Sequence, residues 1–542
     1  MAPSYDDSQN QTAHEQCAID IPVLIVGGGP AGLLQAYMLS QLGGSLPYER
    51  MDAEVLADTP TMIHNIPQPS FEELVASHLS LRKDTEIRKN HSFVTCEQNG
   101  EYVTTTIEDR QAEKEYKVRS KFVIGCDGAK SKVRKCLGVK CEGESSYETM
   151  MTIHFNANLR DVVGKNVGML HWIMDPEVSG FIIGYDLDDN QVLICNFDSE
   201  KNPPDSWNNE LCRRIVTAAI GASVDFEVLS YRPWTLSRKV AESYREGNVF
   251  VAGDAAHSFP PTGGLGLNSG LGDVHNLAYK IAAAVQGWGS SSLLDTYQSE
   301  RRQIALVNSQ QSVKNGQTIF RLLKAIGTEA SSIEQAKENL HESLTDPARK
   351  LVIMKGVEEQ REHFNNLGLH IGYVYGDLET PPSASLYIHS YRPGARLPHA
   401  WISSALLPQY SRDLPAIDSS YVKEFTVEEV ERKQYSTLDL CRFDAFTVII
   451  DKATSSYWHE TLEVLRVKTS NAKWKSFKIN LVTLGIDFEL IPGARGTEWV
   501  KGLQLYHGTA VIVRPDQHIL QSFPAHSTAE QVFKALVQHL GF

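Results

Sequence analysis

The sequence predicts an α/β fold in which a Rossmann-like parallel sheet is interrupted by a mostly antiparallel sheet and followed by a compact C-terminal α/β segment. Three features of the 542-residue chain predict this fold. Short apolar runs end in glycine-containing turns at three widely separated places. Strand-like segments fill the region between the second and third of them. A stretch rich in proline, serine and glycine over 376–398 then separates the C-terminal part.

The first apolar run, Ile21–Val26, has the composition of a buried parallel strand. Gly27, Gly29 and Gly32 follow it as G-x-G-x-x-G and lead into a helical pattern. In this motif the glycines allow a tight turn, close approach of the backbone to a pyrophosphate, and close packing of helix on strand. Glu49 follows Gly27 by 49 − 27 = 22 positions, where an acid binds a ribose hydroxyl. These features predict a dinucleotide site without distinguishing FAD from NAD, and a glycine-rich turn without a ligand is the alternative.

The third apolar run, Val249–Ala252, ends at Gly253-Asp254. A carboxylate at the carboxyl end of a strand can accept a hydrogen bond from a ribityl or ribose hydroxyl. A helix expected to begin near Gly272 would direct its positive end toward an anionic or electron-rich ring. The alternative is an ordinary strand–loop–helix connection with Asp254 as a cap. His257 is a candidate general base, a neighbour of a diphosphate, or a packing residue of the loop.

The second glycine-containing turn, Gly125-Cys126-Asp127-Gly128, closes a strand expected over 116–125. Four basic residues follow it, namely Lys130, Lys132, Arg134 and Lys135. This pattern predicts contact with cofactor phosphates or a nicotinamide donor. A helix-capping Asp127 followed by a solvated basic face is the alternative.

Composition excludes several classes of protein. Hydrophobic residues make up 42% and charged residues 22% of the chain, as in soluble globular proteins, and the length allows about three domains. The formal net charge of -14 argues against nucleic acid or an anionic membrane as the main partner. Eight cysteines without a C-x-x-C pair predict neither a zinc site nor a dithiol redox site, and they fit a reducing, cytoplasmic setting. Neither a secretory signal nor a membrane-spanning segment is expected.

The region after Met150 is expected to form strands over 151–157, 168–174, 180–187 and 191–197, with a hairpin turn at 188–190. Helices are expected over 274–286 and 294–320. The C-terminal part is expected to hold strands over 445–450, 477–484, 510–514 and 518–522, with helices over 458–466, 497–505 and 529–540.

The segments GGGPAGL, GCDGAKSKVR and GDAAHSFPPTGGLGLNSGLGDVHNLAYK resemble the three signatures of single-component FAD-dependent aromatic hydroxylases, which share the para-hydroxybenzoate hydroxylase-like fold. Pro393–Trp401 and Ala510–Ile519 are similar to the phenol 2-monooxygenase branch, which carries a C-terminal thioredoxin-like domain. With Cys441 alone, such a domain would be redox-inert. The resemblance implies that NADPH supplies electrons through FAD and that O2 supplies the oxygen inserted into a phenolic or polyketide-type ring. The sequence PPTGGLGLNSGL resembles that of fungal enzymes of secondary metabolism.

The resemblance also implies roles for individual residues. Glu49 would bind the adenosine ribose, Asp254 the ribityl chain, and Asp127 the diphosphate or the electron donor. Gln68 would touch the flavin side chain, and Trp234 lies near a substrate-facing position of the family. The rest of the expected cofactor-binding set is Gly27, Gly29, Gly32, Gly253, Pro261, Gly264, Gly266, Leu267 and Asn268. The last residues of this set, from Gly264 onward, would line the isoalloxazine. The catalytic base stays unassigned, and no metal is expected.

The expected domains follow from these strand and linker patterns and from the resemblance. A disordered leader occupies 1–20, an FAD-binding domain 21–145 and 246–330, and a substrate-binding β-sheet domain 146–245. A helical segment and linker over 331–400 precedes a thioredoxin-like domain over 401–542.

One departure from the family leaves one alternative open. The stretch between Glu49 and Gln68 is much shorter than in the family, where it supplies a helix, a strand and an arginine near the flavin. The chain would then be a flavin-poor, catalytically weak binding protein. Independently of this departure, a flavin- or NAD-dependent dehydrogenase without oxygen insertion is a further alternative. The expected partner is a small aromatic molecule, and a homodimer stays open.

Overall fold

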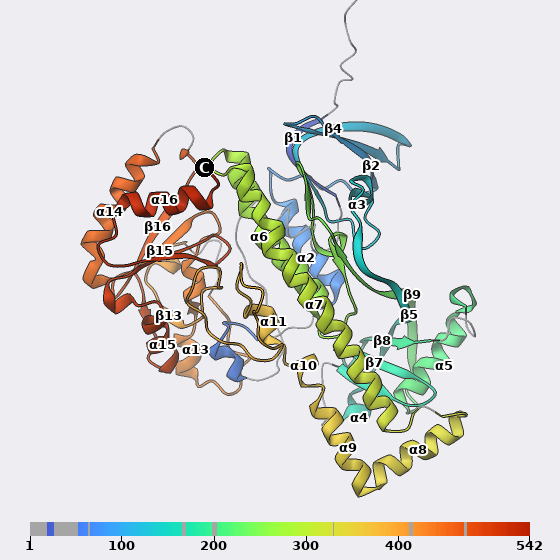
Figure 1. The fold of residues 1–542 in the computed structure, drawn as a ribbon. Helices are drawn as coiled ribbons and strands as arrows, with labels where there is room; N and C mark the ends of the chain where they lie inside the picture. The colour runs from blue at the N-terminus through green and yellow to red at the C-terminus, as the bar shows by residue number, and fades with distance from the viewer. Residues whose placement is uncertain are drawn as a thin grey trace, which may run out of the picture.

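The computed structural model describes residues 19–26, 53–62, 66–164, 170–197, 203–328, 330–410, 416–470 and 474–542. Two long helices, α6 (Leu265–Gln286) and α7 (Ser291–Ala325), run through the centre of the molecule (Figure 1). The two N-terminal sheets lie on one side of this pair and the C-terminal segment lies on the other. The helix pair therefore contacts every large part of the chain.

Three parallel strands form the centre of the first sheet, as the glycine-containing turns predict. They are β1 (Ile19–Val26), β4 (Lys114–Gly125) and β11 (Val249–Val251). Gly125 pairs with Val26 in one direction and with Val251 in the other. The three glycine signatures therefore start from the same edge of one sheet, which is where such folds bind ligands. The antiparallel strands β2 (His91–Gln98), β3 (Val103–Asp109) and β10 (Arg245–Glu246) extend this sheet.

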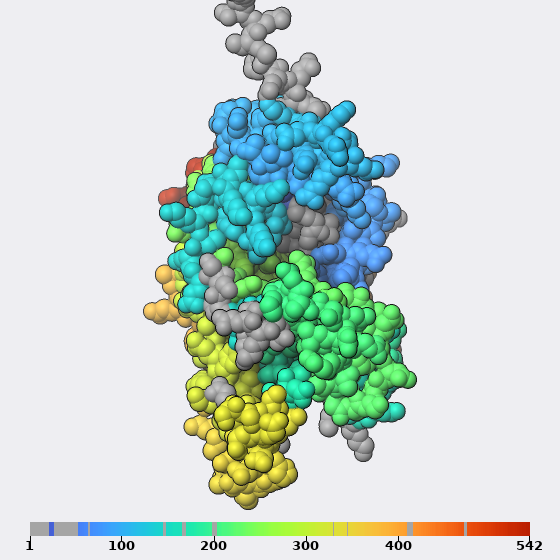
Figure 2. All heavy atoms as spheres, turned by 90° about the vertical axis from the view of Figure 1, so that its right-hand side faces the viewer, coloured from blue at the N-terminus to red at the C-terminus, as the bar shows by residue number. Residues whose placement is uncertain are grey.

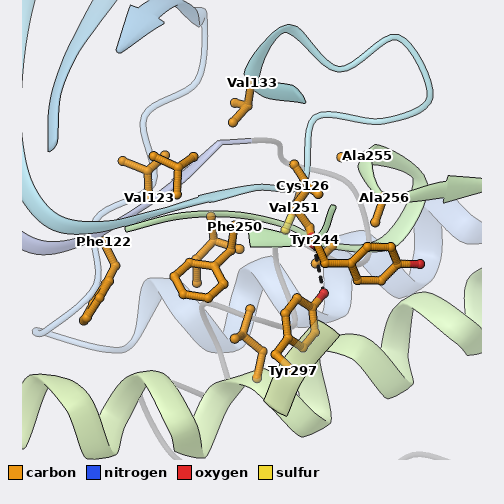
Figure 3. Packing of buried hydrophobic residues seen from close by; sticks show 14 of the residues in the cluster. Phe122, Val123, Cys126, Val133, Tyr244, Phe250, Val251, Ala255, Ala256 and Tyr297 are labelled. Carbon is orange, nitrogen blue, oxygen red and sulfur yellow. Dashed lines mark hydrogen bonds between the residues drawn. The ribbon is translucent and has the colours of Figure 1, made fainter. Parts of the chain in front are cut away.

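A core of buried side chains joins this sheet to α6 and α7 (Figure 3). Phe122 and Phe250 pack edge to face with ring centroids 6.1 Å apart. Tyr297 of α7 donates a hydrogen bond from its hydroxyl to the carbonyl of Val251 at 2.9 Å. Burying each such side chain contributes about 1.5–3 kcal/mol to stability. The strand ends are therefore held on a rigid base.

The second sheet is antiparallel throughout, which confirms the inserted sheet expected from the sequence. Its order is β12-β9-β5-β8-β7-β6. The strands are β5 (Cys141–Ala157), β6 (Leu170–Met174), β7 (Ser179–Asp186), β8 (Asn190–Asn196), β9 (Phe226–Ala241) and β12 (His257–Ser258). Helix α5 (Asn209–Ile220) covers one face, and the short α4 (Arg160–Val163) follows β5. Strand β12, which comes last of these six in the sequence and lies at the edge of the sheet, belongs to the third signature. The two sheets therefore meet at this signature.

The C-terminal segment contains a four-stranded mixed sheet of order β16-β15-β18-β19. The strands are β15 (Phe446–Asp451), β16 (Ile479–Leu484), β18 (Ala510–Val513) and β19 (Ile519–Phe523). Helices α14 (Ser455–Lys468), α15 (Ala494–Gly502) and α16 (Ala529–His539) accompany it. Each expected strand and helix of this part is present within a few residues. Its assignment as thioredoxin-like stays a prediction.

The remaining described elements are short or peripheral. Besides five further single-turn 3-10 helices, they are η1 (Ala53–Ala57), α2 (Gln68–Ser80), α3 (Lys132–Cys136), α8 (Ile333–Thr345), α9 (Pro347–Glu358), α10 (Arg361–Phe364), α11 (Leu367–Ile371), β13 (Trp401–Ser403), α12 (Leu407–Tyr410), α13 (Val427–Arg432), β14 (Tyr435–Ser436) and β17 (Glu489–Leu490). Helices α8 and α9 project at one end of the molecule (yellow in Figure 2). In the described ranges no helix is both long and apolar enough to cross a bilayer.

The shortened stretch after the first signature packs on the C-terminal segment where it is described. Leu56 is buried together with Val422, and its carbonyl accepts a hydrogen bond from the Trp401 indole at 2.9 Å. Asp58 Oδ1 lies 2.9 Å from His389 Nε2 and 2.8 Å from Arg495 Nη2. This stretch therefore ties the N-terminal and C-terminal parts of the chain together.

A second tie is a buried group of charges that we call the docking cluster: Lys280, Glu300, Arg514 and Asp516. Lys280 of α6 donates to Glu300 of α7 at 2.6 Å. Arg514 donates to the other oxygen of Glu300 at 2.7 Å and, through Nε, to Asp516 at 2.9 Å. Because each charge has a partner of opposite sign, the cluster can be buried between the helix pair and the C-terminal sheet.

Candidate cofactor site

The third signature continues directly from β11 into a tight turn and then into α6. Gly253 adopts a positive φ of 60°, which favours glycine. Helix α6 begins at Leu265, inside the signature, and not near Gly272 as the sequence suggested. Gly264 caps the helix in the left-handed conformation with a φ of 65°, and no side chain caps the first turn. The free N–H groups of that turn are donors that a ligand can use.

The reason for the early helix start lies in how its glycines are used. A Cβ atom on Gly272 would come within 2.5 Å of the Arg301 guanidinium of α7. The glycine is therefore a packing residue inside the helix, and it does not mark the helix start. Sequence patterns cannot separate these two uses of glycine without the neighbouring helix.

The third signature contains both buried and exposed residues. Leu265, Ser269 and Gly270 are buried against the body of the protein. The exposed members are Asp254, Pro261, Gly264, Leu267 and Asn268. Leu267 keeps 44% of its surface exposed, and a Cβ atom on Gly264 or Gly266 would meet nothing within 4 Å. Five of the expected cofactor-binding residues are thus exposed, with open space beside Gly264 and Gly266, and we call these five the cofactor wall.

Asp254 lies in a partly enclosed position on this wall. Its side chain is exposed to solvent, yet the surrounding protein raises the pKa of the carboxyl above its ordinary value, against a smaller opposing effect of His257. An exposed acid with a raised pKa is typical of a concave site, where protein replaces much of the water around it. Such a carboxylate gains more than a fully solvated one when a hydroxyl donates to it.

A second group of buried ionisable side chains contacts the turn at Gly253. We call it the signature cluster: His257, Asp273 and Arg301. Asp273 Oδ2 accepts from the backbone N–H of Gly253 at 3.1 Å and lies 2.8 Å from His257 Nε2. Its Oδ1 accepts from Arg301 Nε at 2.9 Å. Burial alone raises the pKa of Asp273, but His257 and Arg301 outweigh burial and lower it. The cluster therefore fixes Gly253 through an ionised carboxylate.

His257 packs inside the loop of the third signature. Its side chain is buried, and its Nε2 proton is directed at Asp273, since a carboxylate can only accept. Its Nδ1 has no hydrogen-bond partner among the described residues. The burial of the ring and its contact with Asp273 favour the packing role over that of general base.

The second signature is joined to the third by one arginine. Arg134 of α3 is buried, and its guanidinium donates to the carbonyls of Ala255 and, at 2.9 Å, Ala129. Asp127 accepts from the Ser131 hydroxyl at 2.5 Å and from the backbone N–H of Lys132 at 2.6 Å. The geometry of Asp127 is thus that of a cap for α3. The basic residues do not act as one face, because Arg134 points inward.

The chain is similar in sequence to known FAD-binding proteins and monooxygenases. Residues 44–312 match the family described as FAD binding domain. The 2,4-dichlorophenol 6-monooxygenase of Delftia acidovorans is 26% identical over 499 residues, which cover 88% of this chain and 78% of that protein. The tetracenomycin A2 monooxygenase-dioxygenase of Streptomyces glaucescens is 29% identical over 69% of this chain, but the match spans only 63% of that protein.

Solved structures show the same fold over nearly the whole chain. The flavin-dependent monooxygenase PieE, solved with FAD and substrate, superposes with a TM-score of 0.80 at 24% identity, covering 97% of this chain and all of that one. The chain belongs to the family of FAD-dependent aromatic monooxygenases. Aklavinone-11 hydroxylase, solved with FAD and aklavinone, gives a TM-score of 0.72 at 21% identity over 97% of this chain.

The residues of this monooxygenase fit the flavin end of FAD as far as they are described. Leu267 offers an apolar contact to a ring, the uncapped start of α6 favours negative charge, and Asp254 accepts from hydroxyls. The residues expected at the adenosine end, Gly27, Gly29, Gly32 and Glu49, lie outside the described residues.

Two expected site residues are not brought to this wall by any described contact. Gln68 begins α2 and donates to Glu72 at 2.7 Å. Trp234 donates from its indole to Thr152 of β5 at 2.9 Å. It lies six positions along β9 from Val240, which pairs with His257, so the separation along the strand is about 20 Å.

Two further features of the structure are a small cavity and the placement of possible metal ligands. A cavity of ≈ 20 Å³ lies between α7 and the loop 373–381, with Asn308 and Tyr373 in its lining. It has room for about one water and is far too small for an aromatic ring. Within the described part of the chain, no group of three or more His, Cys, Asp or Glu side chains is placed to hold a metal ion.

Proposed function

We propose that this protein uses FAD, NADPH and O2 to hydroxylate a phenolic or aromatic polyketide-type molecule. The observation that carries the proposal is the meeting of three signatures at one sheet edge, with an uncapped helix start and Asp254 on one exposed wall. The names of the relatives support the substrate class, because they include a dichlorophenol monooxygenase and a tetracenomycin monooxygenase. A role in fungal secondary metabolism is part of the same proposal.

Each part of the wall would have a distinct task. When bound, FAD would supply the redox chemistry that carries electrons from NADPH to O2. Asp254 would accept from a ribityl hydroxyl and fix the depth of the ring. The N–H groups that open α6 would stabilise negative charge at the ring edge without rearranging during turnover. The signature cluster would hold Gly253, and with it Asp254, in place.

We further propose that 21–145 and 246–330 form the FAD-binding domain and that 146–245 contribute the substrate contacts. The second sheet supports this division, because it joins the third signature through the pairing of β12 with β9. Strand β5 begins at Cys141, so the change of sheet occurs within a few residues of the proposed boundary. A reducing cytoplasm and a homodimer stay part of the proposal.

The decisive experiment has three readings on the purified full-length protein. FAD is titrated into the apoprotein, NADPH oxidation is followed with a panel of phenols, and the product is analysed after turnover in labelled O2. Coupled NADPH consumption and one labelled oxygen in the product are expected. Consumption that ends only in peroxide would overturn hydroxylation for that panel.

The same experiment separates the alternatives. A protein that binds no FAD would be the weak, flavin-poor family member suggested by the short stretch after Glu49. A protein that oxidises its substrate with no label incorporated would be a dehydrogenase. Preparations are compared by their bound FAD per folded protein, so that misfolding is not mistaken for loss of function.

A further inference from the structure

Two cysteines that are far apart in sequence lie together beside the first sheet. Cys96 belongs to β2 and Cys136 is the last residue of α3. Their sulfur atoms are 3.9 Å apart, and both residues belong to regular secondary structure. The pair cannot be predicted from sequence spacing, because forty positions separate the two cysteines.

A bulge in β2 directs Cys96 at its partner. The pairing of β2 with β3 shifts between Phe93 and Thr95, so Val94 is an extra residue in the ladder. In a regular strand, residues three positions apart point to opposite faces. Here Phe93 and Cys96 both pack against the core beneath α3. The bulge therefore creates the thiol pair.

The two thiols differ in exposure and in acidity. Cys136 is exposed, and its sulfur lies 3.5 Å from the Thr95 hydroxyl and accepts from the backbone N–H of Cys96 at 3.5 Å. Partial burial alone raises the pKa of Cys136, but these hydrogen bonds outweigh it and lower the pKa. Burial and the neighbouring Cys136 raise the pKa of Cys96 to about 12. An accessible thiol with a lowered pKa is the one that oxidants attack.

We propose that Cys96 and Cys136 form a reversible redox site that hydrogen peroxide converts to a disulfide. The Cys136 thiol releases its proton to solvent, its thiolate attacks one peroxide oxygen, and the O–O bond breaks. A sulfenic acid forms and hydroxide leaves, which takes one proton back from solvent and becomes the first water. The Cys96 sulfur then attacks Cys136 Sγ, the S–O bond breaks, and the leaving hydroxide takes the Cys96 proton as a second water. Two thiols lose two electrons in total, and one peroxide is reduced to two waters. Closing the bond brings the sulfurs from 3.9 Å to about 2.05 Å.

The position of the pair gives the site a reason to matter. Arg134, two positions before Cys136, holds the carbonyl of Ala255 in the third signature. A disulfide would fasten the end of α3 to β2 and so act on the element that supports the cofactor wall. Peroxide is also the product of uncoupled turnover, and this link alone rests on the proposed function. The disulfide itself requires only added peroxide.

The test uses the reduced full-length protein, with and without FAD. It is treated with increasing hydrogen peroxide, blocked with an alkylating reagent, digested without reduction and mapped by mass spectrometry. The expected result is a linked Cys96–Cys136 peptide, lighter by two hydrogen atoms than the sum of its parts and separated by dithiothreitol. The same linkage is expected without FAD, so failure of the proposed flavin chemistry would leave this result unchanged.

Three variants define the mechanism. In Cys96→Ser, a sulfenic acid at Cys136 should persist and be trapped by dimedone; in Cys136→Ser, Cys96 should stay reduced. Cys141→Ser is the matched control, because Cys141 is also partly buried near this core, and the linked peptide should form as in the wild type. Circular dichroism checks that each variant is folded. Overoxidised Cys136 without a linked peptide, or both thiols unchanged when free cysteine is consumed, would overturn the proposal.

Discussion

The signature cluster and the docking cluster use the same helix pair for different purposes. In both, acids of α6 or α7 are buried between bases. The signature cluster ends on the backbone of its own sheet, at the Gly253 N–H. The docking cluster ends on Arg514 and Asp516, more than two hundred positions further along the chain. One therefore shapes the cofactor turn, and the other holds the C-terminal segment.

The electrostatic balance of the two clusters also differs. His257 and Arg301 outweigh the effect of burial on Asp273 and keep its pKa below the usual range. In the docking cluster, burial outweighs the attraction of Glu300 and lowers the pKa of Lys280 to about 8. Neighbouring charges therefore decide the direction of the shift for Asp273, whereas burial decides it for Lys280.

Removing the acid of the signature cluster should have the largest effect. Asp273→Ala leaves Arg301 buried without its carboxylate and frees the Gly253 N–H, which should cost about 3–5 kcal/mol of unfolding free energy. FAD binding by the remaining folded protein should be lost. Urea unfolding and FAD titration measure the two effects. Asp273→Asn, which keeps an acceptor, should be milder, and unchanged FAD affinity in both variants would break the comparison.

Removing the acid of the docking cluster should cost stability alone. Glu300→Gln removes the negative charge that faces Arg514 and Lys280. The free energy of unfolding should fall by about 3 kcal/mol. FAD affinity should stay at the wild-type value, because no described contact leads from Glu300 to Gly253. A loss of affinity comparable to that of Asp273→Asn would contradict the separation of the two clusters.

Asp254→Asn should reverse that pattern and weaken FAD binding without destabilising the fold. Loss of a hydrogen bond to an ionised acceptor should raise the dissociation constant about tenfold, or ~1.4 kcal/mol. Because the pKa of Asp254 is raised, wild-type affinity should begin to fall at a higher pH than for an ordinary aspartate as the solution is acidified. The variant should lack this pH dependence. Asp161→Asn, an exposed acid of α4, is the matched control.

The smallest expected effect is a pH dependence of stability from Lys280. Its pKa is about 8 in the folded protein and about 10.4 when unfolded. Between these values the unfolded chain binds more protons, so this residue makes the protein more stable as pH rises, and the gain is lost as pH falls through 8. Lys280→Met should remove the dependence in unfolding curves recorded across that window. Parallel curves for both proteins would show that Lys280 titrates normally.

Most of the central sheet could be predicted from the sequence. Buried parallel strands are continuous apolar runs, and Ile21–Val26 and Val249–Ala252 end in turns that only a few folds use. Strand β9 was missed, because Pro233 and the charged residues around it hide its alternation. The start of α6 was misplaced for a related reason, since Gly272 serves Arg301 of another helix.

The site could be predicted in its outline but not in its supports. Asp254, Leu267 and Asn268 were predicted because the third signature is a continuous, specific motif, and the structure places all three at exposed positions. Asp273 and Arg301 were not, since a lone charged residue in a helical pattern reads as solvent-exposed. Their burial becomes visible only when α6 and α7 pack side by side.

The sequence by itself determined the three strand ends, the two kinds of sheet and the family, because these depend on local runs of residue type and on turns that need glycine. Only the tertiary structure decided which charges are buried together and that Cys96 meets Cys136. Those pairings join positions tens to hundreds of residues apart. Their energy comes from burial and from the partner across the gap, and neither is present in the chain before it folds.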